Sequence, residues 1–309
     1  MSVIKSFSVG NGDMFYINHE SENFTVIDCF INQDNETRIL NEIIEKSKRK
    51  KITRFISTHP DEDHIKGLKR FVEKVGINNF YCVENKAGKD VETEDFKEYC
   101  ILRDGKEHFY LYKGCTRKWM NKDGQDDSGY EIGSSGLTIL WPERDNIFFK
   151  EALEEAQKGK SPNNISPIIK YSLKNSVKIL WFGDLETDFM KNIENNLDIE
   201  EADIIFAPHH GRDSGKIPIE ILKRIKPKLI IIGEAPSEDL NYYDGYNTIT
   251  QNSSGDITFD CESREVDIYV SNKGYSVNFL QNKNKSNSYD YYIGSLNIWL
   301  LRKRKKWVD

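Results

Sequence analysis

The sequence predicts an α/β (α+β) protein built from packed layers of helices and strands, and three observations support this fold class. Strand-like segments alternate with helical segments in both halves of the 309-residue chain, and a run of strands opens it. Hydrophobic residues make up 38% of the chain, which is enough to bury a sizeable core. No apolar run approaches the roughly 20 residues of a membrane-spanning helix, so we expect no membrane segment.

The first quarter of the chain predicts a strand meander followed by alternating helix and strand. SFSVG, MFYI and FTVIDCFI read as strands around a turn at Gly10 and Gly12. Residues 35–50 follow as a helix, because their apolar residues recur at helical spacing. A strand at 52–58 then leads through a polar loop to a helix at about 64–75.

The remaining segments predict an insertion, a second set of strands and helices, and a tail. Residues 76–132 are rich in charge and are expected to form an elaborated insertion. GLTILWP, ISPIIKYSL, SVKILWFG, ADIIFAP and PKLIIIGE read as strands, with helices between several of them. We expect one domain over 1–281, followed by a polar segment and a basic, aromatic tail over 282–309.

Charge and cysteine content limit the function classes. The chain has 44 basic and 50 acidic residues, a formal net charge of −6, so any nucleic acid must be bound by a local patch. Five scattered cysteines without a C-x-x-C pair argue against a disulfide framework or a cysteine-rich zinc site. No export signal is visible at the N-terminus, and we expect a cytoplasmic protein.

The loop after the strand at 52–58 carries the strongest chemical signal. His59, Asp61, Asp63 and His64 fall within six residues at the end of a strand. Imidazole and carboxylate are ligands that divalent metals bind readily. The alternative is a solvated acidic turn in which Asp63 caps the next helix.

Two further loops have the same placement. Asp184 follows a strand that ends in Trp181-Phe182-Gly183, and His209 and His210 follow another strand. A helix-capping Asp184 and structural histidines are the alternatives. Because all three loops come after a strand and before a helix, where ligands collect in α/β folds, we expect one shared site.

With these loops in view, the chain resembles the metallo-β-lactamase superfamily, and within it the metallohydrolase domain of the DNA-uptake protein ComEC and its stand-alone relatives. The resemblance covers about residues 3–280. The matching pieces, in chain order, are Val9-Gly10-Asn11-Gly12-Asp13, Ile27-Asp28, Thr58 to His64 with Gly67, Leu140-Trp141-Pro142, Asn163-Asn164-Ile165-Ser166, Gly183-Asp184, and His209-His210-Gly211 with Ser214.

The resemblance implies a four-layer αββα sandwich with a dinuclear metal site along one edge. In this arrangement His59 and Asp61 hold one ion and Asp184 bridges to a second. The second ion is held by the remaining ligands, which are Asp63, His64 and His210.

Three departures from the superfamily pattern bear on the metal. Asp61 stands where most members have histidine, and Arg212 replaces the serine expected after His-His-Gly. No histidine lies between His108 and His209, so Asn164 is the expected stand-in for the third-motif histidine. Oxygen ligands harden the site, so we expect two divalent ions, Zn²⁺ or Mn²⁺, with Mg²⁺ as a third candidate.

The function expected from this resemblance is metal-dependent hydrolysis by a phosphodiesterase or nuclease acting on DNA, RNA or a nucleotide. A metal-bound hydroxide would be positioned by Asp63 or Asp184, His209 would protonate the leaving oxygen, and Arg212 and Ser214 would contact the substrate. The alternative is a catalytically degenerate subunit or sensor that works with a partner protein, which the missing third-motif histidine motivates. Substrate, metal identity, oligomeric state and the role of the tail stay open.

Overall fold

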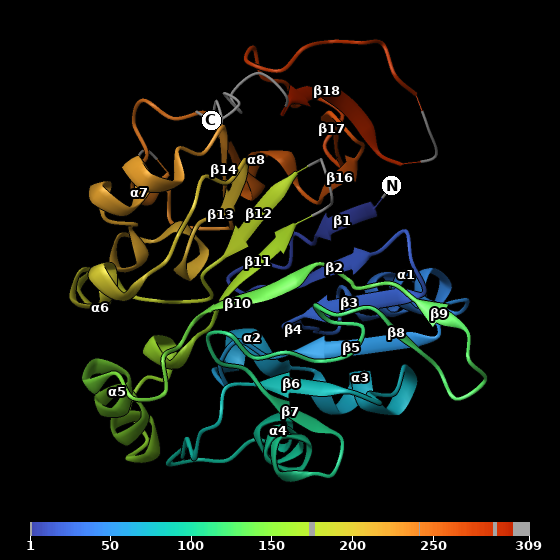
Figure 1. The fold of residues 1–309 in the computed structure, drawn as a ribbon. Helices are drawn as coiled ribbons and strands as arrows, with labels where there is room; N and C mark the ends of the chain where they lie inside the picture. Colours follow the sequence, from blue (N-terminus) through green and yellow to red (C-terminus); the bar gives the residue numbers. More distant parts are fainter. Residues whose placement is uncertain (1, 173–176, 241, 287–288, 299–309) are drawn as a thin grey trace, which may run out of the picture.

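Two large β-sheets lie face to face in the middle of the molecule (Figure 1). The structure is a computed structural model that describes residues 2–172, 177–240, 242–286 and 289–298. Across the first sheet the strands are β18 (Tyr291–Asn297), β17 (Glu265–Val270), β16 (Ile257–Cys261), β1 (Ser2–Ser6), β2 (Phe15–Asn18), β3 (Asn23–Ile27), β5 (Ile52–Ile56), β6 (Phe80–Cys82) and β7 (His108–Tyr110). Across the second they are β10 (Leu137–Trp141), β11 (Ile168–Ser172), β12 (Lys178–Trp181), β13 (Ile204–Phe206), β14 (Leu229–Ile232) and β15 (Thr248–Thr250).

Parallel pairing brings the ends of several strands to one edge of each sheet. In the first sheet β3, β5, β6 and β7 are parallel neighbours, and in the second β12, β13, β14 and β15 are. The other pairs in both sheets are antiparallel. The loops that follow the parallel strands therefore leave their sheets at a common edge.

Helices cover the outer faces of the two sheets. Those packed on the first sheet are α1 (Glu36–Ser47), α3 (Leu68–Lys74) and α4 (Glu94–Asp104), and those packed on the second are α5 (Ile147–Gln157), α6 (Thr187–Ile193) and α7 (Ile219–Ile225). The shorter elements are β4 (Cys29–Phe30), β8 (Gly124–Gln125), β9 (Glu131–Ile132), α2 (Glu62–Ile65), α8 (Gln251–Ser254), and the 3-10 turns η1 (Asn163–Ile165), η2 (Glu194–Asn196), η3 (His209–Gly211), η4 (Asp213–Gly215) and η5 (Ser237–Asp239). None of the helices in the described ranges combines the length and apolar character that crossing a bilayer requires.

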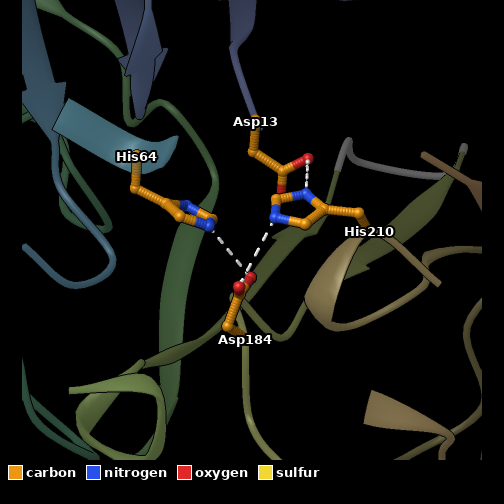
Figure 2. A group of neighbouring side chains, drawn as sticks. All are labelled: Asp13, His64, Asp184 and His210. Atoms are coloured by element: carbon orange, nitrogen blue, oxygen red, sulfur yellow. Dashed lines mark ion pairs between the residues drawn. The ribbon is translucent and has the colours of Figure 1, made fainter. Parts of the chain in front are cut away.

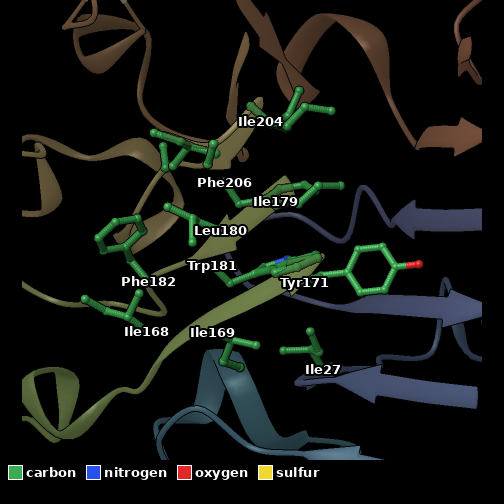
Figure 3. Close-up of a cluster of buried hydrophobic side chains, with 14 of the residues drawn as sticks. Ile27, Ile168, Ile169, Tyr171, Ile179, Leu180, Trp181, Phe182, Ile204 and Phe206 are labelled. Carbon is green, nitrogen blue, oxygen red and sulfur yellow. The ribbon is translucent and has the colours of Figure 1, made fainter. Parts of the chain in front are cut away.

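Two hydrophobic cores explain the layers. The smaller core lies between the first sheet and its helices and includes Phe24 and Val26 of β3 and Ile39 of α1. The larger core fills the space between the sheets and continues beneath the second set of helices (Figure 3). At its centre Trp181 stacks on Phe206, with ring centroids 5.0 Å apart. The predicted α/β class is confirmed, and the order of layers is consistent with the αββα sandwich.

The insertion expected at 76–132 begins later than predicted. β6 and β7 extend the first sheet, and α4 packs on it through buried aromatic side chains. These strands have only three residues each, and the surrounding charged sequence hid them. The elaborated part is instead the stretch after β7, which contains the β8–β9 hairpin.

Two other expected boundaries also differ. The sheet continues past the boundary predicted at 281, because β18 pairs with β17 and buries Gly294, Ser295 and Leu296. The helix expected at 64–75 is two helices, α2 and α3, that meet at Gly67. Gly67 has φ +80°, and a Cβ there would lie 2.7 Å from Cβ of Ile31. The basic run at 302–306 lies outside the described residues.

We predict that Trp181→Ala destabilises the fold by about 3–5 kcal/mol, because it removes a buried ring between the sheets and leaves a cavity. Urea denaturation followed by circular dichroism measures the change. Ile147→Ala is the control, because Ile147 is 61% exposed, and it should shift stability far less. Equal effects of the two substitutions would contradict the assignment of Trp181 to the core.

Candidate metal centre

The predicted site residues gather where loops from both sheets meet. The loop from His59 to His64 follows β5 of the first sheet, Asp184 follows β12 of the second, and His210 lies in η3 after β13. Asp13 comes from the turn between β1 and β2. All of these loops leave their sheets at the edge to which the parallel strands run.

Four of these side chains form a compact donor group. Asp13, His64, Asp184 and His210 each offer one ligand atom, and these atoms lie within 4.8 Å of one another (Figure 2). Asp184 is 1% exposed and lies between the two imidazoles. Its Oδ1 is 3.1 Å from Nε2 of His64, and its Oδ2 is 3.5 Å from Nε2 of His210.

Other imidazoles and a carboxylate surround the same centre. Nε2 of His59 lies 3.9 Å from Oδ2 of Asp184, and Nε2 of His209 lies 3.8 Å from the same oxygen. Oδ2 of Asp63 is 3.4 Å from Nε2 of His210. Four histidines from two sheets therefore direct the same ring nitrogen towards one carboxylate region.

A polar side chain faces the other nitrogen of each of the three buried rings. Nδ1 of His64 is 2.9 Å from Oδ2 of Asp28, and Nδ1 of His210 is 3.2 Å from Oδ1 of Asp13. Nδ1 of His59 lies 3.1 Å from the hydroxyl oxygen of Ser166. Residues that engage Nδ1 fix the tautomer and the ring orientation, and they leave Nε2 free for a metal ion.

Asp28 also ties the end of β3 to the end of β5. Its carboxylate accepts hydrogen bonds from the backbone N–H and the hydroxyl of Thr58, both at 2.7 Å. Asp28, His209 and His210 all have positive φ, at 57°, 51° and 58°. Such backbone costs about 1–3 kcal/mol per non-glycine residue and is kept where the surroundings over-determine it.

The donor atoms that face the centre fit a divalent cation. Among the described residues, the buried atoms without a hydrogen-bond partner include Nε2 of His59, Nε2 of His64 and Oδ1 of Asp184. Leaving several polar atoms unpaired at one buried point is costly. Imidazole nitrogens and carboxylate oxygens are the donor set that Zn²⁺ and Mn²⁺ accept, so a metal ion would satisfy these atoms together.

Electrostatics divide the imidazoles into two kinds. Burial by itself lowers the pKa of His64 and His210, but the nearby carboxylates outweigh this effect. Asp184 and Asp28 hold the pKa of His64 well above its usual value. Asp184 and Asp13 raise the pKa of His210 to about 10. Burial keeps the pKa of His59 well below its usual value, so that ring is neutral. Burial would raise the pKa of Asp184, yet the imidazoles hold it well below its usual range.

Two of the predicted metal ligands, Asp61 and Asn164, contact other polar or charged residues beside the centre. Asp61 is at the rim, where Nζ of Lys89 forms an ion pair with its Oδ1. Asn164 has both amide atoms occupied by Glu186: its Nδ2 donates to Oε2 at 2.8 Å, and its Oδ1 accepts from the Glu186 backbone N–H at 3.0 Å. In the structure the Asn164 amide is turned to Glu186, and its expected role in place of the third-motif histidine stays a prediction.

The predicted substrate residues lie beside the centre. Ser214 holds His209 through a contact of 2.8 Å between its hydroxyl oxygen and Nδ1. Arg212, two residues after His210, donates from Nη2 to Oδ1 of Asn11, which lies two residues before Asp13. His209 is only partly buried, and burial lowers its pKa despite the nearby Asp184.

Sequence reasoning did not give a role to Asp13, Asp28, Ser166 or Lys89. Asp13, Asp28 and Ser166 lie within the motif pieces quoted above, and those motifs were the only signal that pointed to them. Their roles depend on which imidazole each one contacts, and spacing along the chain does not reveal that. Lys89 had no signal beyond its charge.

Comparisons with known proteins agree with the geometry at the level of the superfamily. Residues 8–110 match the metallo-beta-lactamase superfamily, a range that holds Asp13, Asp28 and the loop from His59 to His64. This match supports the superfamily resemblance, whereas the ComEC-like branch stays a prediction. A search of curated protein sequences found no match.

Solved structures similar to this chain include proteins with different activities. A diphosphatase from the PhnP family is 12% identical over 81% of this chain and 94% of that chain, with a TM-score of 0.39. CmlA, a diiron β-hydroxylase from Streptomyces venezuelae, is 12% identical over 75% of this chain and 44% of that chain (TM-score 0.42). The metallo-β-lactamase GOB-18 from Elizabethkingia meningoseptica is 15% identical over 62% of this chain and 68% of that chain (TM-score 0.29). At these values no substrate follows for this chain.

We predict that Asp28→Asn weakens metal binding about 10- to 100-fold, because an amide NH₂ would face Nδ1–H of His64 and the hydroxyl of Thr58 in place of an acceptor. Competition with a chromophoric chelator measures the affinity. Asp145→Asn is the matched control, since the Asp145 side chain is fully exposed. An unchanged affinity in Asp28→Asn would contradict the orienting role.

We also predict that metal binding releases protons and strengthens with pH. Because the pKa of His210 is raised to about 10 and that of His64 is also raised, both rings are protonated at pH 7 in the metal-free protein. A metal ion at Nε2 must displace those protons, so affinity falls as the pH falls and rises as the pH approaches about 10. Calorimetry in buffers of different ionisation enthalpy should give about two protons released per ion. No proton release would contradict the charged state of the rings.

Proposed function

We propose that the protein is a metal-dependent hydrolase that cleaves phosphodiester bonds in nucleic acid or a nucleotide. The observation that carries this proposal is the convergence of buried, unpaired Nε2 atoms of His59 and His64 on Asp184, with His210 and Asp63 at the same point. A bound divalent ion would supply an activated water and would stabilise charge on the reacting phosphate. The residues around it have separable tasks.

Asp63 and Asp184 are suited to orient an attacking water rather than to donate protons. Burial would raise the pKa of Asp63, but its hydrogen bond to His210 and the charge of His64 lower it. Asp184 is likewise kept ionised by the imidazoles beside it. Two carboxylates that stay ionised accept hydrogen bonds from water and cannot serve as acids near neutral pH.

His209 is suited to exchange a proton with the substrate. It is the most exposed of the imidazoles at the centre, and Ser214 fixes its ring. Because its pKa is lowered, it is neutral at pH 7 and accepts a proton before it can donate one to a leaving oxygen.

An anionic substrate agrees with the charges at the rim. Arg212 lies two residues after His210, and its Nε has no hydrogen-bond partner among the described residues. A second cation, Lys89, forms an ion pair with Asp61. A guanidinium offers several N–H donors that match the geometry of a phosphate. These cations favour a phosphodiester over a neutral lactam or lactone.

The experiment is a screen of single- and double-stranded DNA, RNA, cyclic dinucleotides and bis-p-nitrophenyl phosphate with Mn²⁺, Mg²⁺ and Zn²⁺. We predict that Asp184→Asn and Asp63→Asn lower kcat/KM at least about 10²-fold on the preferred substrate, whereas the exposed Asp188→Asn does not. Chelation should abolish turnover, and added metal should restore it. Full activity in either site variant would overturn the mechanism.

The ionic-strength dependence of turnover separates the substrate classes. A nucleic acid substrate should bind much more weakly as salt rises, because phosphate contacts release counterions. A nucleotide substrate should be far less sensitive. A protein that binds no metal and hydrolyses none of these substrates would instead support the degenerate subunit or sensor.

A further inference from the structure

The metal donors around Asp184 are not evenly spaced. Within the described ranges one compact donor group holds Asp13, His64, Asp184 and His210 but neither His59 nor Asp61. Oδ2 of Asp63 lies 3.4 Å from Nε2 of His210 in this group. The other donors are more widely spaced: Nε2 of His59 is 4.0 Å from Oδ2 of Asp61 and 3.9 Å from Oδ2 of Asp184, and Nε2 of His209 is 3.8 Å from that Asp184 oxygen. The Asn164 amide, the expected further ligand beside His59, is hydrogen-bonded to Glu186.

A cation of the protein already contacts Asp61. Nζ of Lys89 contacts Oδ1 of Asp61, and the two side chains are 20% and 25% exposed. Lys89 therefore binds one oxygen of the Asp61 carboxylate, while the other oxygen, Oδ2, faces Nε2 of His59 at 4.0 Å. A half-buried ion pair of this kind is screened less by water than one on the open surface.

The loop that carries Lys89 is fastened to its surroundings. The Gly88 backbone N–H donates to the carbonyl of Ala156 in α5 at 2.9 Å, and a Cβ at Gly88 would lie 3.1 Å from the carbonyl oxygen of Gln157. Asn85 donates to the hydroxyl of Tyr99 in α4 at 2.7 Å. The backbone beneath Lys89 is thus held against two helices.

The far end of the same loop is fixed to the metal loop itself. Thr93 caps α4 by accepting from the Phe96 N–H, and its hydroxyl donates to Oε1 of Glu62 at 2.7 Å. Glu62 lies directly between Asp61 and Asp63. The position of Lys89 relative to Asp61 is therefore set by backbone and capping contacts as well as by the ion pair.

We propose that the Lys89 ammonium takes the place of a second metal ion, so that the protein holds one divalent ion on the His64–His210 side of Asp184. This inference rests on the proposed metal-dependent function. The ammonium neutralises Asp61 and repels a divalent ion near His59, and its N–H groups donate to oxygen atoms of a bound phosphate. Lys89 is then a substrate-contacting cation with a fixed charge, in place of an exchangeable ion.

The test counts metal ions in the purified protein titrated with Mn²⁺ alone. We expect one tightly bound ion per wild-type chain by equilibrium dialysis with elemental analysis, and an electron paramagnetic resonance signal of isolated Mn²⁺. Lys89→Met should bind a second ion about tenfold or more tightly than wild type does, and the spectrum should gain features of a coupled pair. Lys89→Arg should keep one ion because it keeps the charge.

A nearby lysine provides the control for this count. Lys86→Met changes an exposed side chain of the same loop and should leave the metal count at one. Two ions of similar affinity in the wild type would overturn the proposal and leave metal-dependent hydrolysis standing. A lower kcat/KM in Lys89→Met with an unchanged metal count would also overturn it, since Lys89 would then act on substrate only. A wild-type protein that binds no Mn²⁺ would overturn the proposed function itself.

Discussion

The buried carboxylate of Asp184 is the constraint on which the arrangement of the site depends. It is 1% exposed at the junction of the two sheets, and an ionised group there is stable only when positive or hydrogen-bonding groups surround it. His64 comes from the first sheet and His210 from the second, so compensation of this one charge requires loops of both sheets to meet. The layered fold is what makes that meeting geometrically available.

An outer set of contacts holds these partners before any ligand binds. Asp28 and Asp13 each face the Nδ1 atom of an imidazole, and Ser166 links His59 to the backbone N–H of Asp184. The left-handed backbone at Asp28, His209 and His210 is retained at the same place. Strain at the ligands and rigid support behind them are typical of a preorganised site.

The sequence predicted the features that depend on residue type and on position at strand ends. It missed the features that depend on the conformation of loops and on short strands. Charged and imidazole side chains at strand ends predicted one shared site, and the structure brings His64, Asp184 and His210 together there. The short strands β6 and β7 were hidden by charged neighbours, and β18 by the polar segment before it. Whether Asn164 turns to the centre or to Glu186, and whether Lys89 reaches Asp61, is decided by loop geometry that spacing does not encode.

Because loops of both sheets meet at one donor group, metal binding there would link the stability of the fold to the concentration of free metal ions. An ion bound there would fasten the first sheet to the second, and the unfolded chain would offer it no comparable site. Its binding energy is therefore added to the free energy of unfolding, by about 2.7 kcal/mol when the free ion is at 100 times its dissociation constant. With an ion bound, the melting temperature of this protein would depend on the free metal concentration around it.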